Sequence, residues 1–223
     1  MSTGTKHTVT AFDDDMDEIR GLIAEMGARA ESAVKAAMKA LGEHDTELAA
    51  ATRAEDKIID TLETEVEKLV VRTIALRAPM ADDLRELIAA LKMSAVIERI
   101  GDYAKNIAKR VPQMEAKSAL AGNEQLVRMG EIVVEMIRTA MDAYAKRDID
   151  LARAVTARDD DVDQLNKDLF VDFVAYVAKN PKMATEVAHL LFTAKNLERI
   201  GDHTTTVAQM IYFTETGENL PDA

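Results

Sequence analysis

Two short runs in the sequence repeat a pair of carboxylates. The run Glu98 to Asp102 reads Glu-Arg-Ile-Gly-Asp, and the same five residues recur from Glu198 to Asp202, an offset of 100 residues. On a helix, which turns about 100° per residue, Glu98 and Asp102 lie on either side of the direction of Leu91, a core-type leucine. Carboxylates on an apolar stripe are costly unless they pair or bind a cation, and two at i, i+4 repel each other. A single such pair usually faces water. Its repetition makes a cation site or a buried ion pair in each half as well supported as a solvated face.

Four further aspartates share the i, i+4 spacing and stand in equivalent parts of the two halves: Asp56, Asp60, Asp159 and Asp163. Relative to Ile59, the first two lie about 60° and 100° round the helix, at the edge of the apolar stripe. They either lean toward the next helix or face water. Spacing alone favours the solvated face.

The ligand types restrict the metal. The chain has no cysteine, and His203 and His189 lie about 140° and 180° round the helix from Glu198. An all-oxygen donor set disfavours zinc and suits Mg²⁺, Mn²⁺, Ca²⁺ or oxidised iron. The Glu-x-x-His pairs of di-iron bundles are absent, as are phosphate-binding loops and nucleophile motifs. We therefore expect no enzymatic activity.

Glycine breaks the helical pattern beside both carboxylate pairs. Gly101 and Gly201 each stand inside a predicted helix, where glycine costs about 1 kcal/mol relative to alanine. They indicate close approach of another backbone or room for a ligand. Tight helix packing is the simpler explanation.

The elements that carry these residues are helices. The chain contains 9 Gly, 4 Pro and 4% aromatic residues, a composition that favours helix over strand. Asp45 and Asp148 are expected N-caps, and Asp13-Asp14-Asp15 is expected to cap the first helix. The scattered methionines are expected in the core. Proline and capping signals divide the chain into six helices near residues 12–42, 46–77, 81–111, 123–146, 149–179 and 182–214.

The repeat sets the domain organisation. Besides the shared run, Asp45 to Ala49 corresponds to Asp148 to Ala152 with an offset of 103 residues. Two units with the same helical order indicate duplication. We predict an all-α fold of two tandem three-helix bundles with pseudo-twofold symmetry, at residues 7–111 and 123–216, joined by a linker at 112–122.

Charge excludes several classes of function. Lys and Arg number 28 against 40 Asp and Glu, a net charge of −12. Such a surface repels phosphates and anionic lipid, so we expect no nucleic-acid binding and no direct membrane insertion. No apolar run of about 18 residues and no signal peptide is present, and we expect a cytoplasmic protein.

The motifs resemble those of the PhoU family of phosphate-signalling regulators. In the first half the resemblance lies in the runs 82–85 (Asp-Asp-Leu-Arg) and 97–108 (Ile-Glu-Arg-Ile-Gly-Asp-Tyr-Ala-Lys-Asn-Ile-Ala). In the second half it lies in 190–192 and 196–203, and it extends over about residues 7–218. The doubled Glu-Arg-Ile-Gly-Asp at this spacing is a specific signal.

The resemblance implies two three-helix bundles and multinuclear metal sites holding iron, Mg²⁺ or Mn²⁺. The motif acids would be Glu98, Asp102, Glu198 and Asp202, faced by Asp56, Asp60, Asp159 and Asp163. Thr206 and Gln209 depart from the family pattern, in which Asn and an acid are common at these positions. The resemblance therefore does not imply equal metal counts in the two halves.

The resemblance also implies a non-enzymatic negative regulator of the phosphate-starvation response and of phosphate uptake. Such a protein is an adaptor, often a homodimer, between the ATPase subunit of a phosphate ABC transporter and the cytoplasmic part of a sensor histidine kinase. It would be peripheral at the inner membrane through these partners. The alternatives are a metal-storage or metal-buffering bundle without a signalling role and, ranked last, a metal-dependent phosphate hydrolase.

Overall fold

The chain folds into six long α-helices. The computed structural model describes residues 4–115 and 123–221, with side chains from residue 11 onward, and this part contains no strand. The helices are α1 (Gly4–Glu43), α2 (Thr46–Arg77), α3 (Asp82–Ala108), α4 (Glu124–Lys146), α5 (Ile149–Lys179) and α6 (Ala184–Thr216), with short 3-10 turns η1 (Val111–Gln113) and η2 (Pro181–Met183). Much of the expected linker, residues 116–122, lies outside the described residues.

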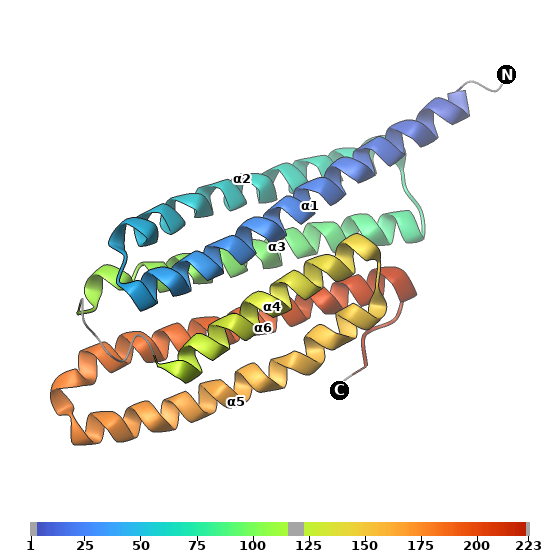
Figure 1. The fold of residues 1–223 in the computed structure, drawn as a ribbon. Helices are drawn as coiled ribbons and strands as arrows, with labels where there is room; N and C mark the ends of the chain where they lie inside the picture. Colours follow the sequence, from blue (N-terminus) through green and yellow to red (C-terminus); the bar gives the residue numbers. More distant parts are fainter. Residues whose placement is uncertain (1–3, 116–122, 222–223) are drawn as a thin grey trace.

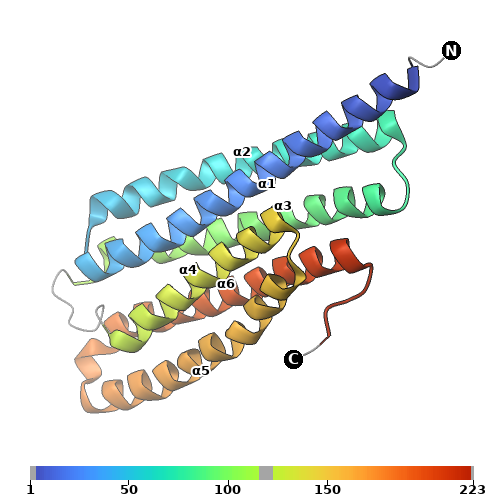
Figure 2. The ribbon, with the colours of Figure 1, turned by 45° about the vertical axis from the view of Figure 1, so that its right-hand side comes forward.

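The helices form two bundles that lie side by side (Figures 1 and 2). Helices α1, α2 and α3 pack together, as do α4, α5 and α6, and the bundles meet along α1 with α4 and along α3 with α6. This arrangement confirms the predicted all-α fold with its duplicated three-helix units. In the part of the chain that is described, no helix is both long and apolar enough to cross a membrane.

Equivalent contacts join α1 and α4 across the pseudo-twofold axis. Gly27 lies against Met141 and Gly130 against Met38, and an offset of 103 residues relates the two glycines and likewise the two methionines. A Cβ at Gly130 would lie 3.0 Å from the Met38 Cε. Two glycines therefore let α1 and α4 approach closely, with a methionine filling the space beside each.

An aromatic contact marks the same axis between α3 and α6. Tyr103 and His203 occupy equivalent positions, and their rings pack edge to face with centroids 5.3 Å apart. Met26, Met93 and Met129 are fully buried, as expected of core methionines.

The two predicted N-caps are confirmed. Asp45 accepts hydrogen bonds from the backbone N–H groups of Glu47 (3.0 Å) and Leu48 (2.9 Å) at the start of α2. Asp148 does the same for Asp150 and Leu151 at the start of α5, at 2.9 and 3.1 Å. These bonds satisfy donors that have no partner within the helix.

The expected cap at Asp13-Asp14-Asp15 is wrong. Helix α1 begins at Gly4, so these aspartates lie well inside it. Asp15 is buried, and its carboxylate accepts from Arg72 at 3.0 Å and from Arg77 at 3.2 Å. Its role is an ion-pair contact between α1 and the end of α2. The start of α1 was misplaced because this cluster of acids has the composition of a first helical turn.

Removing either confirmed cap should destabilise the protein. Asp45→Ala and Asp148→Ala should each lower the free energy of unfolding by about 1 kcal/mol, since each leaves two helix N–H groups without their acceptor. Urea denaturation measures the change. Asp142→Ala is the control, because that aspartate makes an exposed pair with Lys146, 2.9 Å away, and should change stability by less than about 0.5 kcal/mol. Equal effects in all three variants would contradict the capping role.

Candidate metal centre

Each bundle brings four of the predicted acids to one helix pair. Asp56 and Asp60 lie on α2, which packs against the part of α3 that carries Glu98 and Asp102. We call these four residues the first carboxylate cluster. The second carboxylate cluster consists of Asp159 and Asp163 on α5 with Glu198 and Asp202 on α6. Asp56 is buried and Asp159 half-buried against the neighbouring helix, which corrects the solvated face favoured from spacing alone. Asp60 is exposed and the Asp163 side chain is 44% exposed, as a solvated face predicts.

The glycines lie where the two helices of each pair come closest. A Cβ at Gly201 would lie 2.8 Å from the Asp159 Oδ1. A Cβ at Gly101 would lie 2.8 Å from the Ile59 Cδ1 and 3.9 Å from the Asp56 Oδ1. Gly201 thus makes room for a carboxylate of the second cluster, whereas Gly101 mainly makes room for a core side chain beside the first.

The first cluster contains a cation supplied by the chain itself. The Lys105 ammonium donates to the Asp56 Oδ2 and to the Asp102 Oδ1, at 2.6 Å each. Hydrogen bonds to Asp102 and then to Asp56 raise the pKa of Lys105 above its usual range. The side chain of Asp56 is only 7% exposed, so this pair is largely shielded from water. Lys105 therefore neutralises part of the first cluster permanently.

The other two acids of the first cluster are less well compensated. Burial, followed by the nearby charges of Asp102 and Glu63, raises the pKa of Glu98 to about 7, against a lowering effect of Arg99. Arg99 comes no closer than 3.9 Å to the Glu98 carboxylate. Burial and the Asp56 charge also raise the pKa of Asp60.

The second cluster has no such internal cation. Burial, followed by the charges of Asp202 and Asp163, raises the pKa of Asp159 to about 6, against a lowering effect of the nearby Thr205 hydroxyl. The pKa of Asp202 is also raised, by burial and then by Glu198 and Asp163. Desolvation, together with mutual repulsion among the carboxylates, explains these shifts.

Two lysines touch the second cluster from its rim. The Lys195 ammonium lies 2.5 Å from the Glu198 Oε1, whereas the Glu198 Oε2 is buried without a hydrogen-bond partner. Lys167 comes within 3.9 Å of Asp163. Both lysine side chains are about half-exposed or more, so neither is held inside the cluster.

The donor sets differ in how well they suit a metal ion. Within the described residues, no three acidic or imidazole side chains converge tightly enough to chelate an ion. The second cluster has the oxygen donors and the uncompensated charge that a hard cation would satisfy, and Asp159, Asp163, Glu198 and Asp202 would hold it. In the first cluster the Lys105 ammonium already lies between two of the four carboxylates. Sequence reasoning missed Lys105, although it stands three residues after Asp102 and so shares its helix face.

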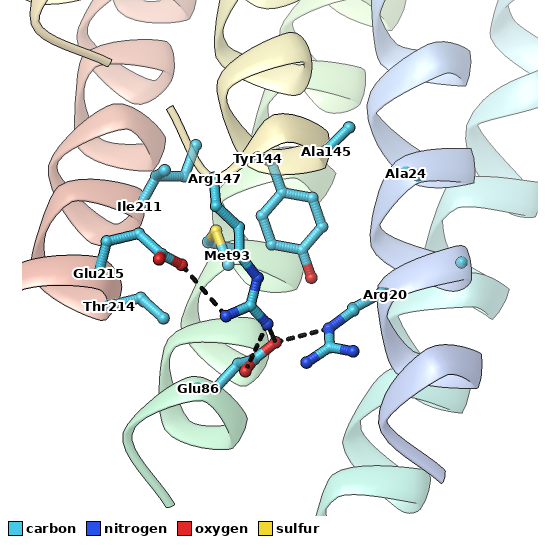
Figure 3. Close-up of a pocket in the computed structure, with 11 residues that line it drawn as sticks. Arg20, Ala24, Glu86, Met93, Tyr144, Ala145, Arg147, Ile211, Thr214 and Glu215 are labelled. Atoms are coloured by element: carbon cyan, nitrogen blue, oxygen red, sulfur yellow. Dashed lines mark hydrogen bonds and ion pairs between the residues drawn. The ribbon is translucent and has the colours of Figure 1, made fainter. Parts of the chain in front are cut away.

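A separate cavity of about 420 Å³ lies between the bundles (Figure 3). Glu86 on α3 accepts from Arg20 on α1 at 2.7 Å and from Arg147 after α4 at 3.1 Å, and Arg147 also reaches Glu215 on α6 at 3.7 Å. The Tyr144 hydroxyl is buried beside them. Two arginines balance two glutamates here, so the arrangement joins the bundles and does not call for a further charge.

The raised pKa of Glu98 should make stability depend on pH. A carboxyl group whose pKa is higher in the folded state than its unfolded value of 4.5 favours folding when protonated. Stability contributed by this group is therefore full below pH 4.5 and is lost as pH rises to about 7. In Glu98→Gln that loss should be absent, so the variant should gain stability relative to the wild-type protein between pH 5 and pH 8 in urea denaturation. Glu131→Gln, at an exposed position of α4, is the control; a wild-type-like pH profile for Glu98→Gln would contradict the assignment.

Comparison with known proteins finds the same two units in the chain. The family model of the PhoU domain matches residues 23–111 and 126–211. A phosphate-specific transport system accessory protein PhoU homolog of Zymomonas mobilis is 47% identical over 216 residues, covering 97% of this chain and 91% of the relative. The Caulobacter vibrioides protein of the same description is 42% identical, covering 97% and 94%.

Solved structures of PhoU proteins superpose on this chain over most of its length. The crystal structure of PhoU from Pseudomonas aeruginosa superposes with a TM-score of 0.90 at 32% identity, covering 93% of this chain and 100% of that one. The phosphate transport system regulatory protein PhoU from Streptococcus pneumoniae superposes with a TM-score of 0.87 at 25% identity, covering 94% and 99%. With both of its halves matched by the domain model and relatives similar over nearly its full length, the chain belongs to the PhoU family.

Proposed function

We propose that this chain is a negative regulator of phosphate uptake and of the phosphate-starvation response. It acts as a non-enzymatic adaptor in the cytoplasm, between the ATPase subunit of a phosphate ABC transporter and the cytoplasmic part of a sensor histidine kinase. The names of its relatives support a role beside phosphate transport, since they are described as accessory or regulatory proteins of that system.

An exposed apolar groove between α5 and α6 is the observation that carries the adaptor role. Its volume is about 650 Å³, and its walls include Phe170, Val171 and Phe192, which are 59%, 65% and 56% exposed. Arg110 covers one face of the Phe192 ring at 4.4 Å from the centroid. Large apolar side chains gathered at one exposed place are typical of a surface that binds another protein.

The duplication shows that the fold does not require this groove. At the equivalent positions of the first bundle, offset by 103 residues on α2 and by 100 on α3, the chain has Glu67, Lys68 and Lys92. The two bundles thus share their helix packing but differ in the polarity of this face. Apolar residues that packing does not demand are best explained by a partner.

The rim of the groove indicates the chemistry of that partner. Lys167 and Lys195 are the only charged residues that line it. An amphipathic helix fits, with an apolar face against Phe170 and Phe192 and acidic side chains beside the two lysines. We assign this occupant to the transporter ATPase or to the kinase.

We further propose that the carboxylate clusters bind metal rather than act in catalysis. A bound cation would neutralise buried acids and locally reverse the charge of an acidic body. Hydrolysis ranks last because the sequence has no phosphate-binding loop and no nucleophile motif. The storage alternative needs many exchangeable sites, whereas the candidate ligands here are confined to two small clusters.

Deletion of the gene should release the phosphate-starvation response. In phosphate-rich medium, an alkaline phosphatase reporter should become constitutive, at least about tenfold above the repressed level, because the negative regulator is missing. The wild-type gene supplied in trans should restore repression. Normal repression in the deletion strain would contradict the regulatory role and favour metal storage.

The groove can be tested in the same strain. Phe192→Ser should fail to restore repression, because it removes an exposed apolar contact for the partner helix while leaving the buried core unchanged. Val71→Ser is the matched control, since Val71 is 56% exposed on α2 of the first bundle, outside the groove. Circular dichroism and sedimentation of both purified variants should match the wild type. Full repression by Phe192→Ser would refute docking at the groove, and a changed oligomeric state would show that a second copy of the chain covers it.

A further inference from the structure

The two carboxylate clusters have matching acids but differ in the positive charge beside them. Lys105 on α3 and Thr205 on α6 are equivalent, because the same offset of 100 residues relates Asp102 to Asp202. All four acids of one cluster have an acid counterpart in the other. The clusters differ in the cations that reach these acids. Lys105, where the second cluster has Thr205, pairs with acids on both helices of its pair, whereas Lys195 and Lys167 each reach one acid on their own helix.

Lys105 takes the place that a metal ion would need in the first cluster. Its ammonium donates to Asp56 on α2 and to Asp102 on α3, at 2.6 Å each, and so joins the two helices. An ammonium offers three donors and no acceptor, and it carries its charge at a single atom. A divalent ion between the same carboxylates would be repelled by that charge and would have to displace both hydrogen bonds.

Thr205 leaves the corresponding place in the second cluster without a charge. The threonine side chain is shorter than that of lysine, and its hydroxyl is buried without a full hydrogen bond. Asp159 and Asp202 consequently face each other with no ammonium between them. One oxygen of Glu198 is buried and unpaired, while the other is held by Lys195, whose side chain is 48% exposed and can turn into water.

We propose that Lys105 is a built-in cation that closes the first cluster to metal, so that the chain takes up an oxygen-ligated metal ion only at the second cluster. This inference rests on the metal binding proposed in the preceding subsection and restricts it to one bundle. The duplicated chain is then chemically asymmetric. One cluster is a permanent ion-pair network between α2 and α3, and the other responds to the metal supply.

The first test locates the metal with Mn²⁺ as the probe. Purified full-length protein is dialysed against Mn²⁺, and the bound metal is measured by mass spectrometry. Asp202→Asn should weaken Mn²⁺ binding at least about tenfold, because it removes a ligand of the second cluster. Asp102→Asn, the matched change in the first cluster, should leave the bound amount and the affinity as in the wild type.

The second test exchanges Lys105 and Thr205. Lys105→Thr should add Mn²⁺ binding about equal to that of the wild type, and Thr205→Lys should abolish binding. The double variant Lys105→Thr/Thr205→Lys should bind the wild-type amount, but at the first cluster, so that adding Asp102→Asn now abolishes it. Lys109→Thr is the control for loss of one positive charge, because Lys109 is exposed just after α3 and should change nothing.

Thermal unfolding provides an independent readout. Metal-free Lys105→Thr should melt below the wild type, because the carboxylates of the first cluster lose their cation, and Mn²⁺ should restore its Tm. Should Lys105→Thr fail to fold without metal, loss of Mn²⁺ binding in Thr205→Lys still tests the inference.

Several outcomes would overturn the inference. Halved Mn²⁺ binding in Asp102→Asn, or no gain in Lys105→Thr, would show that Lys105 does not close the first cluster, and metal binding itself would stand. No Mn²⁺ binding by any variant would reject both the inference and the proposed metal sites. The reporter experiment reads the regulatory role separately, so failure there leaves the metal result unaffected.

Discussion

Carboxylates buried between packed helices need positive charge close by, and much of this molecule is arranged around that need. Asp15 between α1 and α2 is met by two arginines, Glu86 between the bundles by two more, and Asp56 by Lys105. Desolvation makes an unpaired carboxylate costly, whereas a hydrogen-bonded pair is tolerated. Each pair also joins residues from different helices, so the charges help to set how the six helices meet.

The second carboxylate cluster departs from this pattern. Asp163 and Asp202 are more exposed than Asp15 and Asp56, and the lysines that reach the cluster also come from its exposed rim. The raised pKa values of Asp159 and Asp202 measure the resulting imbalance. Elsewhere in the protein, buried acids are compensated by ion pairs. These four acids remain short of positive charge, and a bound cation would supply it.

Sequence reasoning recovered the features that depend on local patterns. Helix spacing, the caps at Asp45 and Asp148 and the repeat were sufficient for the six helices and their pairing into two units. Glu98 and Asp102 were found because their position relative to Leu91 follows from helix geometry, whereas the aspartates that face the motif acids were proposed from the family resemblance. Asp15 was misassigned, since an aspartate near a helix start resembles a cap and its arginine partners lie 57 and 62 residues away.

Other features depended on contacts that no single helix reveals. Lys105 has an ordinary sequence context, and its role appears only when α2 brings Asp56 beside it. The groove was missed because Phe170 and Phe192 continue apolar stripes, and periodicity does not tell a buried stripe from an exposed one. The sequence signal that could have revealed the groove is a difference in polarity between equivalent positions of the two units, such as Phe192 against Lys92.

The lysines at the groove also determine how an acidic partner arrives. At distances beyond the Debye length, about 8 Å in physiological salt, the partner meets the screened field of a chain with a net charge of −12. That field repels it from most directions. Near Lys167 and Lys195 a short-range attraction opposes that repulsion over one small area. Encounters elsewhere on the surface are therefore brief, and the partner is selected by orientation as much as by affinity.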